Sequence, residues 1–375
     1  MQLRYYIFLL IMMLEGVIFA QDDKTAIDFY NKGVEYYNSK NYELAIASYT
    51  SCLEKDPTYV KAWFNRGNCA MNLQQYDKAL NDFDKTTHLD PEFVKAFLFK
   101  GYTQLLKGDY AGSISTLTLA ITKDPSMSKA YVNRGTAYMK AGTYELAIHD
   151  FTSAITKGEH SYATFLNRAI CKNKTNDLAG ALADFNAASD VKPDQSVTSA
   201  EKAKIYLKLH KWNEAIAEIT NAVRKNPSDA DLYQNRGYAK LMLEDISGAM
   251  TDFSICLQID PNHLSALKNK AFTSYKMGKY EEAASDYTNL LKTDGKNAEL
   301  YVHRGTCYLE IKSYEKALTD FTEAITCKKD FAEAYFNRAN TYTKLLDPKK
   351  ACQDIKECIK LGYDPARAHV NNVCN

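Results

Sequence analysis

The sequence has almost no net charge, and it lacks the residue clusters that mark metal or redox sites. Across 375 residues, 47 Lys and Arg balance 46 Asp and Glu. This balance gives no electrostatic reason to expect nucleic acid or an anionic membrane as the main ligand. The seven histidines are scattered, and neither Cys-x-x-Cys nor His-Glu-x-x-His occurs. Because metal sites need such clustered ligands, the sequence predicts no metal and no cofactor.

Motifs for phosphate binding and nucleophilic catalysis are also missing. The chain has no glycine-rich phosphate loop and no Gly-x-Ser-x-Gly, and no insertion interrupts its repeats. We therefore expect a protein that is not an enzyme and has no small-molecule substrate. A catalytic or lectin-like activity is the weakest alternative.

One long apolar run is present, at the N-terminus. MQLRYYIFLLIMMLEGVIFAQDD carries an Arg near its start, an apolar stretch, and a polar end after Ala20. This layout predicts a signal peptide over residues 1–20 and a short linker over 21–25. Glu15 disfavours a membrane-spanning helix, although an uncleaved anchor stays open as the one route to a membrane. We expect an exported protein, periplasmic or associated with the cell envelope, and secretion also stays open.

A strict 34-residue period fills the rest of the chain. A Gly or Ala recurs without insertion or deletion at 33, 67, 101, 135, 169, 203, 237, 271, 305 and 339. When this residue is numbered position 8, the ten repeats start at 26, 60, 94, 128, 162, 196, 230, 264, 298 and 332. Such a period indicates a stacked repeat architecture.

Each repeat has the pattern of two amphipathic helices, here named helix A and helix B. Positions 4, 8 and 11 and positions 20, 24 and 27 follow helical spacing. A break near positions 14–16 separates the two sets, and a Pro at position 32 closes several repeats. Small residues at positions 8 and 20 are expected to let the two helices approach closely.

This pattern resembles the tetratricopeptide repeat over residues 26–365. The resemblance implies an all-α, right-handed α-solenoid of ten helix-turn-helix repeats. It also implies an inner groove lined by the helices A, and a protein or peptide as partner. A short capping helix is expected to start at Asp364-Pro365, with residues 366–375 as the cap. The C-terminus also resembles those of exported repeat proteins from the Bacteroidetes group.

Arginine at position 7 always comes with aspartate at position 23. Six repeats have this combination, for example Arg66 with Asp82. An antiparallel hairpin that turns near position 15 brings positions 7 and 23 opposite each other. A guanidinium can then bind a carboxylate through two hydrogen bonds. We interpret the Arg as a structural link inside the repeat; a basic ladder for phosphates is the alternative.

Asparagine recurs at position 6, where the family resemblance places a residue that faces the groove. An amide both donates and accepts hydrogen bonds, so a series of them can bind a peptide backbone. The arrangement resembles the asparagine ladder in the repeat domain of the eukaryotic O-linked GlcNAc transferase. The equal alternative is that the asparagines merely solvate a polar inner wall or bond to a neighbouring helix. The predicted ladder comprises Asn31, Asn65, Asn133, Asn167, Asn235, Asn269 and Asn337.

A basic and aromatic patch is predicted in repeats two to four. Its lysines occupy position 2, and apolar side chains accompany them. Acidic residues take position 2 in later repeats, so the groove is expected to be polarised. The predicted patch comprises Lys61, Lys95, Lys129, Phe64, Leu98, Phe99 and Tyr102.

Nine cysteines are present, and most occupy core positions of the repeat. We expect those at positions 10 and 27 to be buried free thiols, with a disulfide framework as the alternative. Cys352 and Cys374 lie eleven residues either side of Tyr363. In a hairpin that turns there they would be opposite, which predicts a disulfide between them.

Together these features predict a non-catalytic exported scaffold that binds an extended polypeptide segment in its groove. The alternative is a structural component of a cell-envelope assembly, docked through the convex face that the helices B form.

Overall fold

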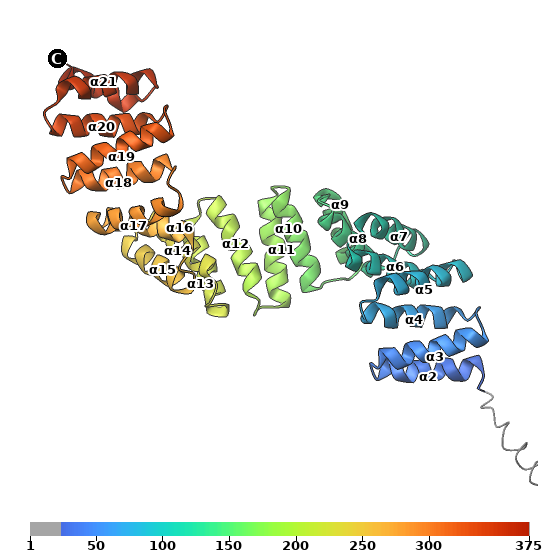
Figure 1. Ribbon diagram of the computed structural model, residues 1–375. Helices are drawn as coiled ribbons and strands as arrows, with labels where there is room; N and C mark the ends of the chain where they lie inside the picture. Colours follow the sequence, from blue (N-terminus) through green and yellow to red (C-terminus); the bar gives the residue numbers. More distant parts are fainter. Residues whose placement is uncertain (1–23, 375) are drawn as a thin grey trace, which may run out of the picture. The chain divides into compact units, whose positions relative to one another are not determined.

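The computed structural model describes residues 24–374, so the predicted signal peptide and its cleavage point lie outside the described residues. Between residues 24 and 374 every regular element is a helix and none is a strand. The chain divides after Val191 into two compact units. In each unit the helices are paired, and each pair packs against the next along the chain (Figure 1). The predicted all-α repeat solenoid is thereby confirmed.

The first unit contains five helix pairs. Their bounds are α2 (Ala26–Asn38), α3 (Tyr42–Lys55), α4 (Val60–Asn72), α5 (Tyr76–Leu89), α6 (Val94–Lys107), α7 (Tyr110–Lys123), α8 (Ser128–Lys140), α9 (Tyr144–Thr156), α10 (Tyr162–Lys174) and α11 (Leu178–Val191).

The second unit contains five further pairs and a C-terminal cap. The bounds are α12 (Ser196–Lys208), α13 (Trp212–Lys225), α14 (Ala230–Met242), α15 (Ile246–Ile259), α16 (Leu264–Lys276), α17 (Tyr280–Thr293), α18 (Ala298–Glu310), α19 (Tyr314–Cys327), α20 (Ala332–Lys344), α21 (Pro348–Lys360), the 3-10 helix η1 (Asp364–His369) and α22 (Val370–Val373).

Helices A and B join through a turn whose residue at position 15 always has a positive φ. The angle lies between 55° and 87° in all ten repeats, although only Gly108, Gly142 and Gly278 are glycines there. In this conformation the next backbone N–H groups reach back to the last carbonyls of helix A, as in Lys40 N to Tyr37 O and Asn41 N to Tyr36 O. The repeat geometry therefore imposes a left-handed residue that the sequence does not always favour.

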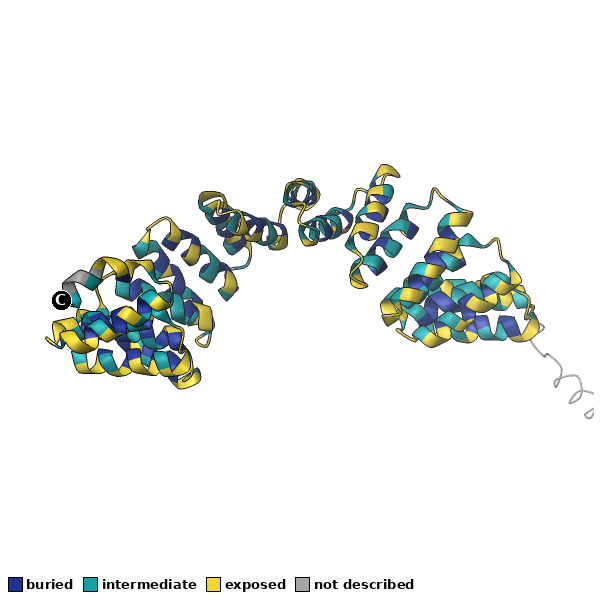
Figure 2. Cartoon of the chain, turned by 90° about the horizontal axis from the view of Figure 1, so that it is seen from above, coloured by how far each residue is buried: buried dark blue, intermediate teal, exposed yellow. Residues whose placement is uncertain are grey.

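The core of each repeat forms where position 8 of helix A meets position 24 of helix B. A Cβ atom added to Gly33 would lie 2.5 Å from the Tyr49 ring, and one added to Gly67 would lie 2.9 Å from the Phe83 ring. Both ring residues are fully buried. Figure 2 shows the buried residues on the helix sides that face neighbouring helices. The expected close approach of the two helices is confirmed.

The cap closes the last repeat. Ala366 of η1 is fully buried, and it packs in one cluster with Ile355 and Cys358 of α21. The Phe336 and Tyr363 rings lie 5.3 Å apart. The 3-10 helix of the cap begins at Asp364, where the capping helix was expected to start, because Pro365 is suited to the first turn of a helix.

Candidate functional site

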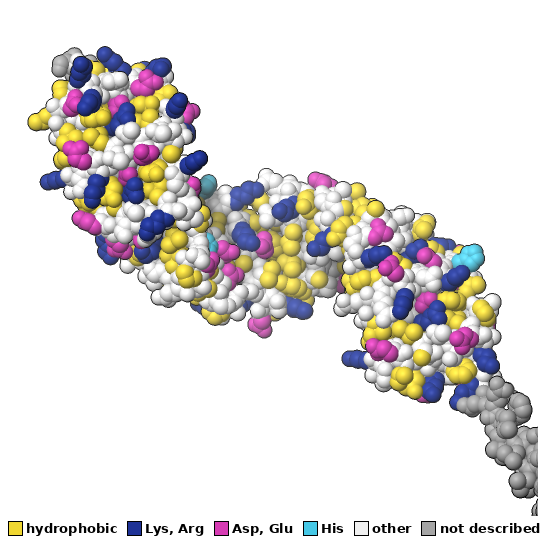
Figure 3. Space-filling model, viewed as in Figure 1, with side chains coloured by type: hydrophobic (Ala, Val, Ile, Leu, Met, Phe, Trp, Pro, Cys, Tyr) yellow, Lys and Arg dark blue, Asp and Glu magenta, His cyan; other side chains and the backbone are white. Residues whose placement is uncertain are grey.

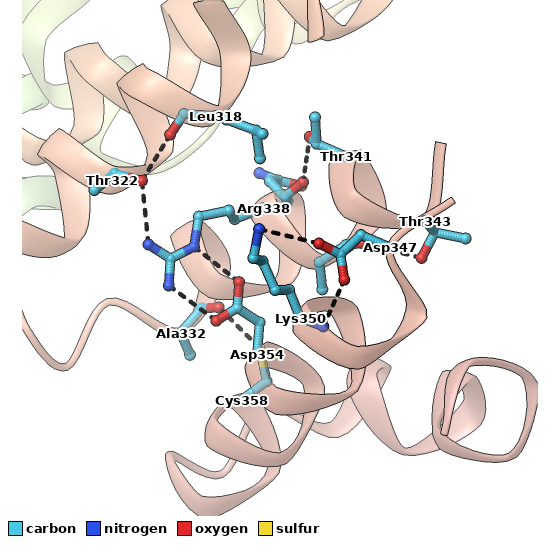
Figure 4. Close-up of polar contacts among 12 residues, drawn as sticks. Leu318, Thr322, Ala332, Arg338, Thr341, Thr343, Asp347, Lys350, Asp354 and Cys358 are labelled. Atoms are coloured by element: carbon cyan, nitrogen blue, oxygen red, sulfur yellow. Dashed lines mark hydrogen bonds and ion pairs between the residues drawn. The ribbon is translucent and has the colours of Figure 1, made fainter. Parts of the chain in front are cut away.

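The arginine at position 7 uses all three of its guanidinium nitrogens in hydrogen bonds inside the fold. Arg338 donates from Nε and Nη2 to the two carboxylate oxygens of Asp354, at 2.8 and 2.9 Å (Figure 4). Its remaining nitrogen, Nη1, donates to the Thr322 hydroxyl of the preceding repeat at 3.1 Å. The guanidinium therefore joins the two helices of its own repeat and also ties that repeat to the one before it.

The same three-residue arrangement occurs in every repeat that has the arginine. The two Arg–Asp bonds measure 2.6 to 2.9 Å, and the aspartates are at most 5% exposed. The hydrogen bond to the aspartate carboxylate raises the pKa of four of these arginines, Arg134, Arg236, Arg304 and Arg338. The structural role of the Arg is confirmed. The other triads are Arg66–Asp82–Thr50, Arg134–Asp150–Thr118, Arg168–Asp184–Thr152, Arg236–Asp252–Thr220 and Arg304–Asp320–Thr288.

The threonine was not predicted, although the sequence contains a signal for it. A Thr stands 16 residues before each of the six arginines. Where position 7 is lysine the partner varies: Lys100 forms an ion pair with Asp84 of the preceding repeat at 2.6 Å. Lys270 pairs with Asp286 of its own repeat at 2.8 Å. The contact that position 7 makes with the preceding repeat therefore depends on whether the residue is arginine or lysine.

The position 6 asparagines do not all behave alike. Asn65 donates from Nδ2 to the Tyr30 hydroxyl at 3.1 Å, so its amide is bound to the neighbouring repeat. Asn31 is exposed. The other five are partly buried, and residues 24–374 supply no hydrogen-bond partner for their side chains. Those five amides can bind a ligand backbone: Asn133, Asn167, Asn235, Asn269 and Asn337.

A pocket of about 800 Å³ opens on the helix A side of the first unit, across α4, α6 and α8. The structure here brings together most of the predicted basic and aromatic patch. Its wall is apolar, and its rim carries Lys95, Lys129, Asn133 and Glu159. We call this the anchor pocket; its wall consists of Phe64, Leu98, Phe99, Tyr102, Met127 and Val132.

Phe99 shapes the anchor pocket because it replaces the position 6 asparagine of repeat three. Its ring packs edge-on against Phe64, with centroids 5.4 Å apart, and lies 6.3 Å from the buried Phe83 ring. Phe64 in turn contacts Phe93 at 4.9 Å. The aromatic wall is therefore held by the core behind it.

The two lysines of the anchor pocket carry unpaired charge. Lys95 and Lys129 are exposed, and no acidic group among residues 24–374 forms an ion pair with either. Lys61 is also exposed but does not line the pocket, so the predicted patch is smaller than the sequence suggested. Elsewhere, on the face that Figure 3 shows, charges of both signs are interspersed.

A smaller pocket of about 200 Å³ opens on the helix A side of the second unit, across α16, α17 and α18. It contains Asn269 and, where His303 replaces the position 6 asparagine, an imidazole stacked 5.5 Å from the Tyr287 ring. Glu299 lies on this pocket at the position where the anchor pocket has lysine.

The structure joins Cys352 to Cys374 by a disulfide, with Cα atoms 4.9 Å apart, between α21 and the end of the cap. Six of the remaining seven cysteines are buried free thiols, as expected. Burial raises their pKa; that of Cys52 becomes about 11 and that of Cys69 about 12. These thiols belong to the core and not to a reactive site.

Residues 24–374 contain no group of three or more His, Cys, Asp or Glu side chains that could hold a metal ion. In the same range, no helix is long and apolar enough to cross a membrane.

Family comparisons agree with this architecture. Models of the tetratricopeptide repeat match residues 26–59, 60–93, 132–195, 201–263, 274–330 and 332–361. The chain belongs to the tetratricopeptide repeat family. Proteins with tetratricopeptide repeats generally serve as scaffolds for protein–protein interaction and are typically non-catalytic.

Several solved structures share this fold with the chain at low sequence identity. The C-terminal part of a tetratricopeptide repeat protein from Cytophaga hutchinsonii has 17% identity and a TM-score of 0.56, over 64% of this chain and 98% of that one. A repeat protein from Parabacteroides merdae has 18% identity and a TM-score of 0.48, over 66% and 99%. YrrB, described as having an unusual peptide-binding site, has 19% identity and a TM-score of 0.47, over 50% and 97%. These likenesses show the fold alone. No curated protein sequence matches the chain.

Proposed function

We propose that this tetratricopeptide repeat protein is an exported, non-catalytic scaffold that binds an extended polypeptide segment on its helix A side. The observation that carries the proposal is the contrast between positions 6 and 7 of helix A. All three guanidinium nitrogens of each arginine donate hydrogen bonds inside the fold, as in Arg338, whereas five asparagine amides have no partner among residues 24–374. Unsatisfied amides along one side suit the alternating donors and acceptors of a peptide backbone.

Spacing supports the same proposal within each unit. Equivalent asparagines such as Asn133 and Asn167 stand on neighbouring helices A, which pack roughly 8–10 Å apart. An extended peptide advances about 3.3 Å per residue, so one amide would meet about every third residue. Export rests on the sequence of residues 1–23 and would place the partner in the periplasm, the envelope or the medium.

The test compares the native protein with an Asn133→Ala/Asn235→Ala variant, which removes one amide from each unit. The matched control is Asn81→Ala/Asn213→Ala, because both of these asparagines are exposed on helices B. Peptides selected from a random 12-residue phage library are measured by fluorescence anisotropy. With each lost hydrogen bond worth about 1 kcal/mol, a peptide that loses one such bond should bind the first variant roughly fivefold more weakly, and the control should show no change.

Two results would overturn the proposal. If the library yields no binding peptide, the helix A side is not a peptide site. If the control variant loses binding while the first variant keeps it, the partner docks on the helices B, as the envelope-assembly alternative requires.

A further inference from the structure

The anchor pocket combines three features. It has a volume of about 800 Å³, its wall is mainly aromatic and aliphatic, and its two lysines form no ion pair among residues 24–374. The smaller pocket of the second unit has a volume of about 200 Å³ and carries Glu299 at the equivalent edge. One part of the helix A side is therefore specialised, beyond what backbone binding requires.

The aromatic wall is suited to one large apolar side chain. Phe64 and Phe99 meet edge-to-face at 5.4 Å, and both are partly exposed toward the pocket. A ligand ring or branched chain that covers them would remove apolar surface from water, which is the main source of affinity at such sites. Because Phe99 replaces an asparagine, the pocket gains an apolar wall at the cost of one backbone-binding amide.

The lysines define one edge of the pocket. Lys95 and Lys129 both occupy position 2, at the N-terminal ends of α6 and α8, one helical turn before the apolar residues Leu98 and Val132. Neighbouring helices A lie roughly 8–10 Å apart, so the two ammonium groups face segments of a ligand that are two or three residues apart. Unpaired cations at this spacing favour carboxylates in a ligand.

An extended chain can satisfy both features at once. Its successive side chains point to opposite sides, so residues i and i+2 can face the lysine edge while residue i+1 enters the apolar wall. Asn133, whose amide has no partner within residues 24–374, stands one turn after Lys129 and can bind the backbone between them. Glu159, at another point of the rim, disfavours a carboxylate there and so orients the acidic residues toward the lysines.

We propose that the anchor pocket selects an extended segment in which one large apolar residue is flanked by acidic residues. This inference rests on the proposed peptide-binding function and names the class of segment that is bound in the first unit. The asparagines then supply affinity for any extended backbone, while the anchor pocket supplies the sequence preference.

Synthetic peptides test the preference directly. Four fluorescent 12-residue peptides share one background and differ in a central triplet: Glu-Phe-Glu, Gln-Phe-Gln, Glu-Ala-Glu or Lys-Phe-Lys. We expect Glu-Phe-Glu to bind the native protein at least tenfold more tightly than each of the other three. Raising the salt concentration should reduce its advantage over Gln-Phe-Gln, because exposed charges are screened.

Charge reversal supplies the decisive variant. Lys95→Glu/Lys129→Glu should weaken Glu-Phe-Glu binding at least tenfold and should make Lys-Phe-Lys the preferred peptide. The matched control is Lys55→Glu/Lys85→Glu, which makes the same change of charge on exposed helix B sites and should leave the preference unchanged. Phe99→Asn, checked for folding by a thermal melt, should abolish the difference between Glu-Phe-Glu and Glu-Ala-Glu.

The outcomes separate this inference from the function on which it rests. If all four peptides bind equally and charge reversal changes nothing, the peptide site stands and the anchor preference is overturned. If none of the four binds but library peptides do, the preference is again overturned. If no peptide of any composition binds, both proposals fail.

Discussion

The helix A side of each unit carries a pocket, and the two pockets differ in size and charge. In the first unit, repeats two to four enclose about 800 Å³ beside Lys95 and Lys129. In the second unit, repeats eight and nine enclose about 200 Å³ beside Glu299 and His303. Each pocket includes one position 6 residue that is not asparagine, Phe99 in the first unit and His303 in the second.

The framework around these pockets is the same in both units. Arg134 with Asp150 and Thr118, and Arg304 with Asp320 and Thr288, form equivalent triads five repeats apart. The comparison teaches that positions 7, 8, 23 and 24 hold the repeat together, while positions 2 and 6 differ between the two pockets. Recognition can therefore differ between units without a change of fold.

The largest expected effect comes from breaking the shared triad in each unit. Arg134→Ala and Arg304→Ala leave Asp150 and Asp320, which are 1% and 2% exposed, without their partner. Loss of one member of a buried pair costs about 3–5 kcal/mol of unfolding free energy. Urea denaturation should show the two losses to be similar. A loss in one unit only would contradict a common framework; the exposed Lys140→Ala provides the neutral control.

A smaller effect is expected at position 8 of repeats three and eight, where the first unit has Gly101 and the second has Ala271. A Cβ on Gly101 would lie 2.5 Å from Cγ of the fully buried Leu117, so Gly101→Ala should cost about 1–3 kcal/mol. Ala271→Gly should cost only about 1 kcal/mol through helix propensity. Thermal melts of both variants check this. An unchanged Tm for Gly101→Ala would show that repeat three tolerates a wider helix separation.

A stabilising effect of about 1 kcal/mol is expected in the last A–B turn of the second unit. Leu346 has a φ of 58° and is 88% exposed, so it holds a left-handed conformation without contacts that compensate for it. Leu346→Gly should therefore raise the free energy of unfolding by about 1 kcal/mol. Gly278→Ala, at the same turn position with a φ of 75°, should lower it by a similar amount. Equal stability of all three proteins would argue against strain in this turn.

The smallest expected effect is a difference in cysteine reactivity between the two units, measured without any substitution. All three cysteines of the first unit are buried, whereas the second has one exposed free thiol, Cys327. Burial raises the pKa of Cys69 and Cys307 to about 12, so their reactive thiolate form is scarce at pH 8. Brief iodoacetamide treatment of the native protein, followed by peptide mass spectrometry, should label Cys327 alone. Labelling of Cys69 before unfolding would contradict its burial.

Contacts inside one repeat could be predicted because helix geometry fixes them. A hairpin that turns near position 15 places Arg66 opposite Asp82 whatever the neighbouring repeats do, and the observed bonds of 2.8 and 2.9 Å follow. The same reasoning, centred on Tyr363, indicated the pairing of Cys352 with Cys374 that the structure contains.

The individual partners in contacts between repeats were not predicted, because they depend on how one helix pair packs on the next. Thr50 meets Arg66, and the Asn65 amide meets the Tyr30 hydroxyl, only once that packing is set. The exclusion of Lys61 from the anchor pocket has the same origin. The binding role of the remaining asparagines and lysines stays a prediction for the experiments above.

The sequence by itself determined the 34-residue period, the paired helices and the Arg–Asp links, since each follows from spacing along one chain segment. Only the tertiary structure decided which amides keep free hydrogen-bonding groups and where an apolar wall opens beside unpaired lysines. The physical reason is that burial and hydrogen bonding are properties of side chains from several repeats together, and no single repeat contains them.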